Sequence, residues 1–325
     1  MRNAAAAMAL TLALFAAPLS AQSAEWTHGV LVAKADAGFV FMAARRGFAE
    51  RQGIELEIAE FRSDAVALRA LIAGELDSFE GSPGGAMVAA SEGARVKIVG
   101  CYWPELTYGI FARPNIASVA DLAHARVAIS APGALPELLV RAVLEQNNIS
   151  DDDITFAALG GDVDRFQALA AGIADAAAAS TELVPDAEAR GLHLLVHAHE
   201  AMPQYLRFCI YMRADTIAER AEDAAHYLAA QSNALRFALN DREATLALAH
   251  EVTGSDAADV NPSYIYDEVM RLNAITPDLA IPEARLVWMR DLLTRTGSMR
   301  RELDVAAMID NSVRTRAMTL VDTAP

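Results

Sequence analysis

The stretch Ala70–Asp77, ALIAGELD, decides the fold, because it occurs a second time as Ala168–Asp175, ALAAGIAD. Each copy predicts the end of a helix, a glycine that stops it, and an aspartate just before a strand. This arrangement is typical of folds in which helices and strands alternate. Its return in the second half of the chain therefore predicts two similar α/β lobes.

The sequence around the first copy alternates short apolar runs with helical patterns. Strands are expected at 29–33, 54–61, 78–79 and 96–102, and helices at 39–51, 65–73 and 84–92. This βαβαβ order predicts a mostly parallel sheet with helices on both faces.

The alternation begins again around the second copy, with strands expected at 126–130, 154–158 and 174–179 and helices at 136–147 and 163–171. The strand-like segments Tyr108–Pro114 and Tyr205–Met212 would leave the first lobe and return to it. From Asp215 onward the pattern is helical. We expect a first lobe at 25–110 and 206–325 and a second lobe at 111–205. The cleft between them is the expected place for a small ligand.

Composition limits the class of partner. A chain of 325 residues has room for about two domains, and its 54% of apolar residues excludes a disordered chain. The formal net charge of −16 argues against nucleic acid and anionic membranes, since both would repel the protein. We expect a small-molecule ligand and no nucleic-acid partner.

The first residues have the layout of a secretory signal peptide. Arg2 supplies a positive charge, Ala4–Ala17 is an apolar run, and Leu19–Ala24 offers small residues for cleavage. The apolar run is shorter than the roughly 20 residues of a membrane span, and no cysteine lies near it to carry a lipid anchor. We expect a signal peptide at 1–24 and a mature, soluble protein in the periplasm. An uncleaved membrane anchor is the alternative.

Together these features resemble the periplasmic substrate-binding proteins of ABC importers, and most of all the nitrate/sulfonate/taurine and thiamine-precursor group, the NMT1/THI5-like proteins. The matching segments are Ala44–Ile54, Gly74–Asp77, Ser82–Pro83 with Ala89–Gly93, Asp121–Leu122 before Val127–Ala128, Gly172–Asp175, and Trp288–Met289 with Gly297. The resemblance implies an α/β, two-lobed periplasmic-binding-protein type II fold with two crossover strands and a helical C-terminal segment. It also implies a monomer that captures its ligand by hinge closure and delivers it to an ABC permease in the inner membrane.

Ligands of open α/β sheets bind outside the carboxyl ends of the strands, near helix N-termini. In the first lobe this rule selects six candidate ligand-binding residues: Asp36, Gly38, Phe39, Glu80, Ser82 and Pro83. Phe39 would wall the site, and Ser82 would offer a hydroxyl group beside small residues that let the backbone approach a ligand. The alternatives are that Asp36 only caps a helix, that Ser82 lies in an ordinary turn, and that Glu80 is a solvated edge charge.

In the second lobe the same rule selects Ser130, Gly133, Ala134, Thr181 and Glu182. The N–H groups of the turn before the helix at 136–147 suit an anion such as a carboxylate or sulfonate. Three aromatic residues near the crossings complete the set as either ligand-stacking or core side chains: Tyr102, Trp103 and Tyr205.

The charge of the ligand stays open. No arginine stands in these turns, and the cleft edge instead offers the carboxylates of Asp36, Glu80 and Glu182. Helix N-termini favour an anion, whereas carboxylates favour an amine or a ring N–H. A neutral or zwitterionic small molecule, aromatic or heterocyclic, satisfies both. By resemblance, the sulfonate binders favour the anion and the precursor binders the heterocycle.

Nothing in the sequence predicts catalysis, a cofactor or a metal site. The motifs of serine hydrolases, zinc proteases, ATP-binding loops and dinucleotide-binding loops do not occur. The histidines His193, His197 and His199 would share one face of a strand, so a metal site is a minor alternative. Other functions left open are a ligand sensor for a membrane partner and a pyrimidine-synthase-like enzyme, although the Cys-rich motif of such enzymes is missing.

The chain has two cysteines, Cys101 and Cys209. We expect two buried thiols, since free cysteine is among the most buried residue types. A disulfide across the hinge is the alternative in an oxidising compartment.

Overall fold

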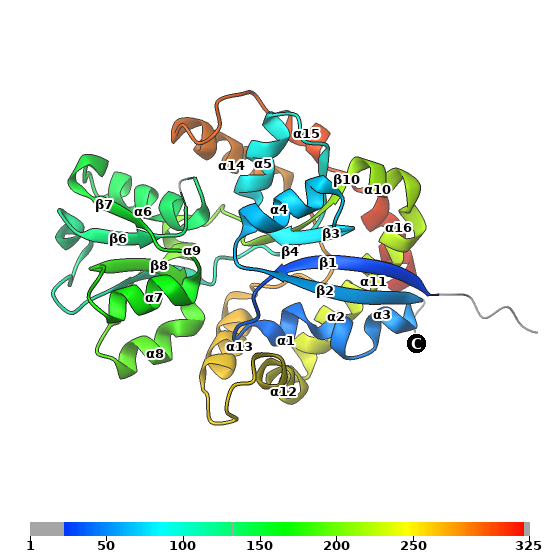
Figure 1. Cartoon of the computed structure of the whole chain (residues 1–325), viewed down its shortest axis with the longest axis horizontal. Helices are drawn as coiled ribbons and strands as arrows, with labels where there is room; N and C mark the ends of the chain where they lie inside the picture. Colours follow the sequence, from blue (N-terminus) through cyan, green and yellow to red (C-terminus); the bar gives the residue numbers. More distant parts are fainter. Residues whose placement is uncertain (1–22, 132, 322–325) are drawn as a thin grey trace, which may run out of the picture.

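The computed structural model describes residues 23–131 and 133–321, so the predicted signal peptide lies outside them apart from its last two residues. Two α/β lobes lie side by side, each built on a five-stranded sheet (Figure 1). Among the described residues, no helix has the length and apolar character needed to cross a membrane.

The first lobe is built on a sheet of order β2-β1-β3-β10-β4. Its strands are β1 (Ala24–Leu31), β2 (Ile54–Phe61), β3 (Ser78–Gly81), β4 (Val96–Trp103) and β10 (Phe208–Arg213). The strands β1, β2 and β3 are parallel, while β10 runs antiparallel to both β3 and β4. The expected strands are therefore present, and a late segment of the chain completes the first sheet.

The helices of this half are α1 (Ala37–Val40), α2 (Met42–Arg45), α3 (Phe48–Arg51), α4 (Asp64–Ala73) and α5 (Pro83–Ser91). The expectation of one helix at 39–51 is wrong, since that segment forms three short helices. Gly47, with φ of 74°, adopts a left-handed conformation that interrupts the helix between α2 and α3.

The second lobe has the sheet order β7-β6-β8-β5-β9. Its strands are β5 (Tyr108–Ala112), β6 (Arg126–Ile129), β7 (Thr155–Ala158), β8 (Ala176–Ser180) and β9 (His193–His197). Its helices are α6 (Leu135–Gln146), α7 (Asp162–Ala170), α8 (Val184–Ala189) and α9 (Ala198–Ala201), with short 3₁₀ turns at η1 (Val119–Leu122), η2 (Asp151–Asp153) and η3 (Thr181–Leu183).

The repeated stretch plays the same part in both lobes. Gly74 and Gly172 take the left-handed conformation, with φ of 86° and 74°. The Oδ2 atom of Asp77 accepts a hydrogen bond from the backbone N–H of Thr27 in β1, at 2.9 Å. In the second lobe, Oδ2 of Asp175 accepts one from the N–H of Arg126 in β6, also at 2.9 Å. Each aspartate therefore ties the start of the strand that follows it, β3 or β8, to the neighbouring parallel strand, β1 or β6.

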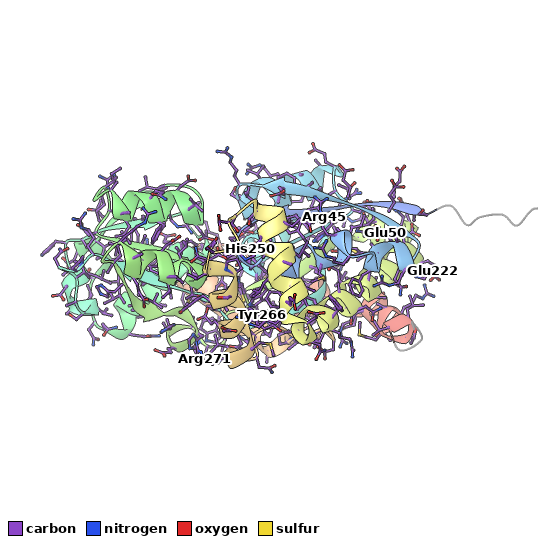
Figure 2. All side chains as sticks on the ribbon, turned by 90° about the horizontal axis from the view of Figure 1, so that it is seen from below. Arg45, Glu50, Glu222, His250, Tyr266 and Arg271 are labelled. Atoms are coloured by element: carbon purple, nitrogen blue, oxygen red, sulfur yellow. A yellow bond between two sulfur atoms is a disulfide. The ribbon has the colours of Figure 1, made fainter. Side chains whose placement is uncertain are left out.

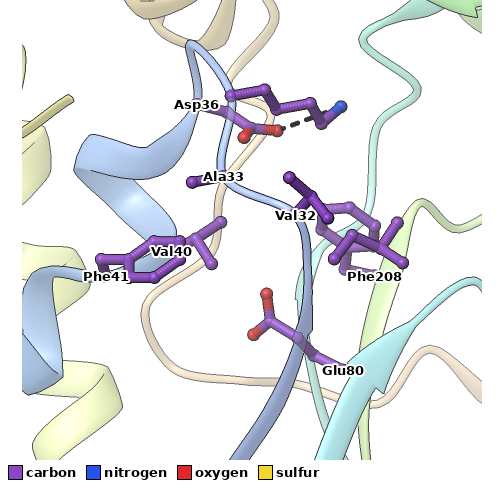
Figure 3. Close-up of a pocket in the computed structure, with 9 residues that line it drawn as sticks. Val32, Ala33, Asp36, Val40, Phe41, Glu80 and Phe208 are labelled. Carbon is purple, nitrogen blue, oxygen red and sulfur yellow. Dashed lines mark ion pairs between the residues drawn. The ribbon is translucent and has the colours of Figure 1, made fainter. Parts of the chain in front are cut away.

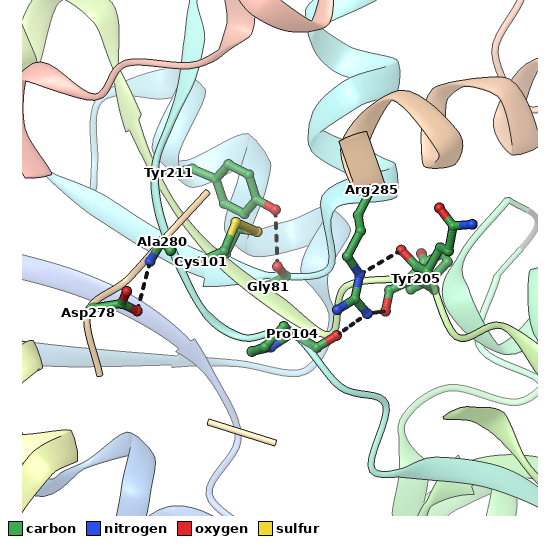
Figure 4. The surroundings of a disulfide bond; sticks show 10 residues. Gly81, Cys101, Pro104, Tyr205, Tyr211, Asp278, Ala280 and Arg285 are labelled. Carbon is green, nitrogen blue, oxygen red and sulfur yellow. Dashed lines mark hydrogen bonds between the residues drawn. A yellow bond between two sulfur atoms is a disulfide. The ribbon is translucent and has the colours of Figure 1, made fainter. Parts of the chain in front are cut away.

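The chain passes between the sheets twice, between Trp103 and Tyr108 and again between His197 and Phe208. The guanidinium group of Arg285 holds both crossings (Figure 4). It donates to the carbonyl oxygen of Pro104 at 2.7 Å in the first crossing. In the second, it donates to that of Tyr205 at 3.1 Å.

The C-terminal third is helical, as expected: α10 (Ala214–Glu219), α11 (Ala221–Asn240), α12 (Arg242–Thr253), α13 (Asn261–Leu272), α14 (Glu283–Arg295), α15 (Val305–Met308) and α16 (Ser312–Val321). Most of these helices cover the first lobe, with α11 packed on α16, α2 and α3. The helix α13, which carries Tyr266 and Arg271, also contacts η3 and α8 of the second lobe (Figure 2).

The two cysteines form a disulfide bond, so the expectation of two thiols is wrong (Figure 4). Cys101 of β4 and Cys209 of β10 are opposite each other in the first sheet, and both are fully buried. The disulfide named as the alternative is present, but the 108 residues between the two positions gave no local sign that they lie side by side in one sheet. The bond joins two strands of one sheet, where the chain leaves the first lobe and where it returns, and it does not cross the hinge.

Gly38 offers a test of how α1 packs. A Cβ atom at this position would overlap the carbonyl oxygen and the Cγ2 atom of Thr245 in α12. We expect Gly38→Ala to lower the free energy of unfolding by about 1–3 kcal/mol through overpacking. Urea denaturation measures this change. The control is Gly85→Ala in α5, where the nearest atom lies 3.9 Å from the new Cβ and where a helical alanine is neutral or stabilising. Equal stabilities of the two variants would contradict the packing.

Candidate functional site

The turns after β1, β7 and β8 bring charged side chains together between the lobes. In the first lobe, the Nζ atom of Lys34 lies 3.6 Å from Oδ2 of Asp36. From the second lobe, Oδ2 of Asp162 lies 3.2 Å from that Nζ atom, and Oε1 of Glu182 lies 3.4 Å from it. One ammonium group of the first lobe thus binds two carboxylates of the second.

A second cation, Arg207, reaches this place from the return crossing. Its Nη2 atom donates to Oδ2 of Asp36 at 2.6 Å, and its Nη1 atom donates to the carbonyl oxygen of Thr107 at 3.4 Å. Its Cζ atom lies 4.3 Å from the centre of the Trp103 ring. The turns selected from the sequence contain no arginine, but Arg207, which precedes the antiparallel strand β10, reaches the carboxylate of Asp36 from outside them.

A third cation, Arg165, lies on α7 in the second lobe. It pairs with Asp162, three residues earlier, and its Nε atom donates to the carbonyl oxygen of Ala178 at 2.7 Å. The hydroxyl group of Tyr108 donates to Oδ1 of the same aspartate at 2.6 Å. The interlobe charge cluster, as we call it, consists of Lys34, Asp36, Asp162, Arg165, Glu182 and Arg207.

The members of the cluster shift one another's pKa values. Burial lowers the pKa of Lys34, but the charges of Asp36, Glu182 and Asp162 outweigh it and raise this pKa above its usual range. Burial raises the pKa of Asp162, but Lys34 and Arg165 bring it below the ordinary value. For Glu182 burial prevails over the attraction of Lys34, and its pKa rises to about 7. The pKa values of two carboxyl groups beside one ammonium group, Asp162 and Glu182, thus shift in opposite directions.

A further carboxyl group, Asp64, stands at the start of α4. Burial, followed by the charge of Asp162, raises its pKa to about 7. Its Oδ1 atom is buried and has no hydrogen-bond partner, and the same is true of Oε2 of Glu182. The region between the lobes thus holds two carboxylate oxygens that can accept hydrogen bonds.

Glu80 of β3 is buried and paired, and is not a solvated edge charge. Its Oε1 atom accepts a hydrogen bond from the hydroxyl group of Tyr102 at 2.6 Å, and its Oε2 atom lies 3.3 Å from Nε2 of His28. Beside it is a small hollow with apolar walls and a charged rim (Figure 3). The hollow is lined by Leu31, Val32, Ala33, Lys34, Asp36, Val40, Phe41, Glu80 and Phe208.

The turns around Ser82 and Gly133 form a second meeting point between the lobes. The Ser82 hydroxyl group lies 2.8 Å from that of Tyr205. A Cβ atom on Gly84 would lie 3.2 Å from the same tyrosine oxygen and 4.0 Å from the carbonyl oxygen of Gly133. Pro83 begins α5 and is buried. Ser130 and Ala134 are half-buried beside Gly133, whose N–H donates to the carboxylate of Glu137 within α6.

Thr181 forms a third contact. Its hydroxyl group donates to the carboxylate of Glu268 on α13, and both side chains are buried. Nearby, Nδ2 of Asn261 donates to Oδ2 of Asp186 at 3.0 Å, again between α13 and the second lobe. The C-terminal helices therefore touch both lobes.

Three of the selected residues lie in the core of the first lobe. Gly38 packs against α12. The ring of Phe39 stacks on Tyr266, with 5.6 Å between ring centres, and meets Trp103 edge to face at 5.7 Å. Phe39 and Trp103 are almost fully buried. Trp103 reaches the charge cluster only through the guanidinium group of Arg207.

Sequence reasoning left out several of the charged groups. Asp162 and Arg165 follow β7, and the strand-end rule selects them once it is applied to that strand. For Lys34 the sequence offered a different signal, the rarity of lysine. Of the 27 lysines and arginines in the chain, only two are lysines. Asp64 follows β2 in the same way. For Arg207 the only signal was its place before the return strand.

The three histidines do not share one strand face. His193 and His197 bound β9, but His199 lies in α9. The rings of His197 and His199 are 5.2 Å apart between centres. Within the part of the chain that the structure describes, no group of three or more His, Cys, Asp or Glu side chains is arranged to hold a metal ion.

The model of the family described as NMT1/THI5 like matches residues 34–245. No curated protein sequence matches the chain.

Solved structures share the fold at low sequence identity. The alkanesulfonate-binding protein SsuA from Xanthomonas axonopodis pv. citri, bound to MOPS, matches with a TM-score of 0.74 and 17% identity over 89% of this chain and 98% of that one. The zinc-bound ligand-binding component of an ABC-type import system from Staphylococcus aureus matches with a TM-score of 0.74 and 13% identity, covering 90% and 99%. A mutant of DSZB in complex with biphenyl-2-sulfinic acid matches with a TM-score of 0.64 and 14% identity, covering 90% and 99%. The expected two-lobed periplasmic-binding-protein fold is confirmed.

Proposed function

This chain belongs to the NMT1/THI5-like family, and on that premise we propose that it is an exported, monomeric solute-binding protein. It captures a small organic molecule between its lobes in the periplasm and delivers it to an ABC importer in the inner membrane. The alkanesulfonate-binding and import-system proteins that share its fold support this role.

The observation that carries the proposal is the convergence of strand ends from both lobes. Lys34 of the first lobe contacts Asp162 and Glu182 of the second, and the Ser82 turn approaches the Gly133 turn. Neither lobe supplies all of these groups by itself. A ligand placed among them contacts both lobes only when the lobes are together, and this difference in contacts drives closure.

We propose binding without a catalytic step. Cys101 and Cys209 are bonded to each other, and they are the only cysteines in the sequence. Neither offers a thiol nucleophile. Burial raises the pKa values of Tyr102 and Tyr205, so both hydroxyl groups stay protonated at neutral pH. That of Tyr102 donates to Glu80, and that of Tyr205 pairs with the hydroxyl group of Ser82.

A thermal-shift screen tests the proposed function. The library contains sulfonates, aromatic acids, pyrimidines and amino acids, because a ligand that binds the native state raises the melting temperature. We expect at least one class to do so and to reduce the radius of gyration in small-angle X-ray scattering. Turnover of a hit, or no shift from any class, contradicts the function.

The double variant Ser82→Ala/Thr181→Ala tests where the ligand binds. Each hydroxyl group lies at a meeting point of the lobes, and its removal takes away one hydrogen-bonding group worth about 1 kcal/mol. We expect the affinity for a screening hit to fall by about tenfold or more, measured by calorimetry. The control Ser91→Ala/Thr294→Ala removes hydroxyl groups that bond only within α5 and α14. Unchanged affinity in the first variant would place the ligand elsewhere.

A further inference from the structure

We propose that the ligand carries a cationic nitrogen, an ammonium or amidinium group, which binds between Glu182 and Asp64. The inference rests on the proposed function and names the chemical class of its ligand. Three features of the interlobe region support it.

The first feature is that the cations of the site already have partners. The ammonium group of Lys34 contacts three carboxylates. The guanidinium group of Arg207 bonds Asp36 and a carbonyl oxygen. That of Arg165 bonds Asp162 and the carbonyl oxygen of Ala178. An anionic ligand would have to break these pairs to obtain a cation.

The second feature is a surplus of acceptors. The carboxyl groups of Asp36, Asp64, Asp162 and Glu182 stand against only three cations. Glu182 is 2% exposed, yet its Oε2 atom has no hydrogen-bond partner. A buried acceptor without a partner costs about 1–3 kcal/mol, and an N–H donor on the ligand removes this cost.

Asp64 offers the matching acceptor from the first lobe. Its Oδ1 atom is buried and lacks a partner. Gly81 of β3 lies against this oxygen, since a Cβ atom added to Gly81 would lie 2.5 Å from it. Glycine at position 81 therefore leaves room for this oxygen. The charges of Asp162 and Lys34 act on both Asp64 and Glu182.

The third feature concerns the place that sequence analysis assigned to an anion. In the turn before α6, the N–H of Gly133 already donates to the carboxylate of Glu137. A carboxylate of the protein itself therefore occupies the position that would otherwise attract a carboxylate or sulfonate of the ligand.

Four aromatic probes of similar size test the inference: benzylammonium, benzamidinium, benzoate and benzenesulfonate. We expect the two cations, at millimolar concentration, to raise the melting temperature and the two anions to leave it unchanged. Binding of either anion in preference to the cations, or no binding of either cation, overturns the inference. The thermal-shift screen of sulfonates, aromatic acids, pyrimidines and amino acids tests the proposed function separately. A protein that captures only anions would still be a solute-binding protein.

Substitutions at the two acceptors locate the cation. We expect Glu182→Gln and Asp64→Asn each to weaken benzamidinium binding by about tenfold or more, as for the loss of a hydrogen bond to a charged group. The control Glu251→Gln removes an exposed carboxylate that pairs with Arg46 far from the site and should leave the affinity unchanged. Equal affinity in all three variants contradicts the placement.

Proton release gives a readout that does not depend on these variants. Because burial raises the pKa values of Glu182 and Asp64 to about 7, a cation that binds beside them expels the protons that they hold at pH 6.5. Calorimetry in two buffers of different ionisation enthalpy should show this release, and cation affinity should increase from pH 6 to pH 8. Binding that is independent of pH over this range contradicts the inference.

Discussion

Lys34→Met is expected to separate the lobes and to destabilise the protein at pH 8. The substitution removes the ammonium group that contacts Asp36, Asp162 and Glu182 and leaves those carboxylates without it. Removing one partner of a buried ion pair typically costs about 3–5 kcal/mol. Repulsion between the carboxylates of the two lobes should increase the radius of gyration in small-angle scattering.

The effect of Lys34→Met depends on pH in a definite direction. Burial raises the pKa of Glu182 to about 7. A carboxyl group with a raised pKa in the folded state contributes stability at low pH, and this contribution is lost as the pH rises through about 7. Asp162, whose pKa is lowered by Lys34 and Arg165, contributes stability at neutral pH that Lys34→Met reduces. The variant should therefore approach the wild type in melting temperature near pH 5.5 and fall furthest below it at pH 8.

The chain supplies a matched control in its other lysine. Lys97 donates to the carbonyl oxygen of Ala307, at a distance from the cluster. We expect Lys97→Met to change the melting temperature little and to show no widening gap between pH 5.5 and pH 8. Equal behaviour of the two methionine variants, or an unchanged radius of gyration in Lys34→Met, would mean that the ammonium group does not hold the lobes together.

Local rules predicted much of the fold because the responsible residues act over short range. A glycine stop followed by an aspartate specifies the same strand contact in each lobe, which Asp77 and Asp175 make with near-identical hydrogen bonds. The strand-end rule likewise selected Asp36 and Glu182, which the structure brings to one ammonium group. The repeated aspartate contact and the strand-end carboxylates depend on a few neighbouring residues and on the order of the strands.

The remaining features depend on pairings between distant parts of the chain. Arg207 reaches Asp36 across 171 positions of sequence, because β10 returns to the first sheet between β3 and β4. That same insertion places Cys209 beside Cys101. Phe39 illustrates the reverse case. It follows a strand end, but α13 supplies Tyr266 as a stacking partner and encloses it. No local pattern contains these partners.

The largest loss of stability is expected for the double variant Cys101→Ala/Cys209→Ala. The disulfide closes a loop between positions 108 residues apart. For a loop of this length, restriction of the unfolded chain is worth about 4–5 kcal/mol in the chain-entropy model. We expect urea denaturation to show a loss of about 3–5 kcal/mol in the free energy of unfolding. Reductant added during unfolding should lower the free energy of unfolding of the wild type in the same way and leave the double variant unaffected.

Alkylation followed by mass spectrometry tests the bond itself. Both sulfur atoms are fully buried, so the protein is first unfolded in urea. The wild type should gain no alkyl group without reductant and two with it. A gain of two without reductant would show that the thiols are free, and the expected loss of stability would then not follow. Because the bond lies within the first sheet and not across the hinge, the double variant should keep its ligand affinity below its unfolding transition. A loss of binding there would mean that the bond also positions the two crossings.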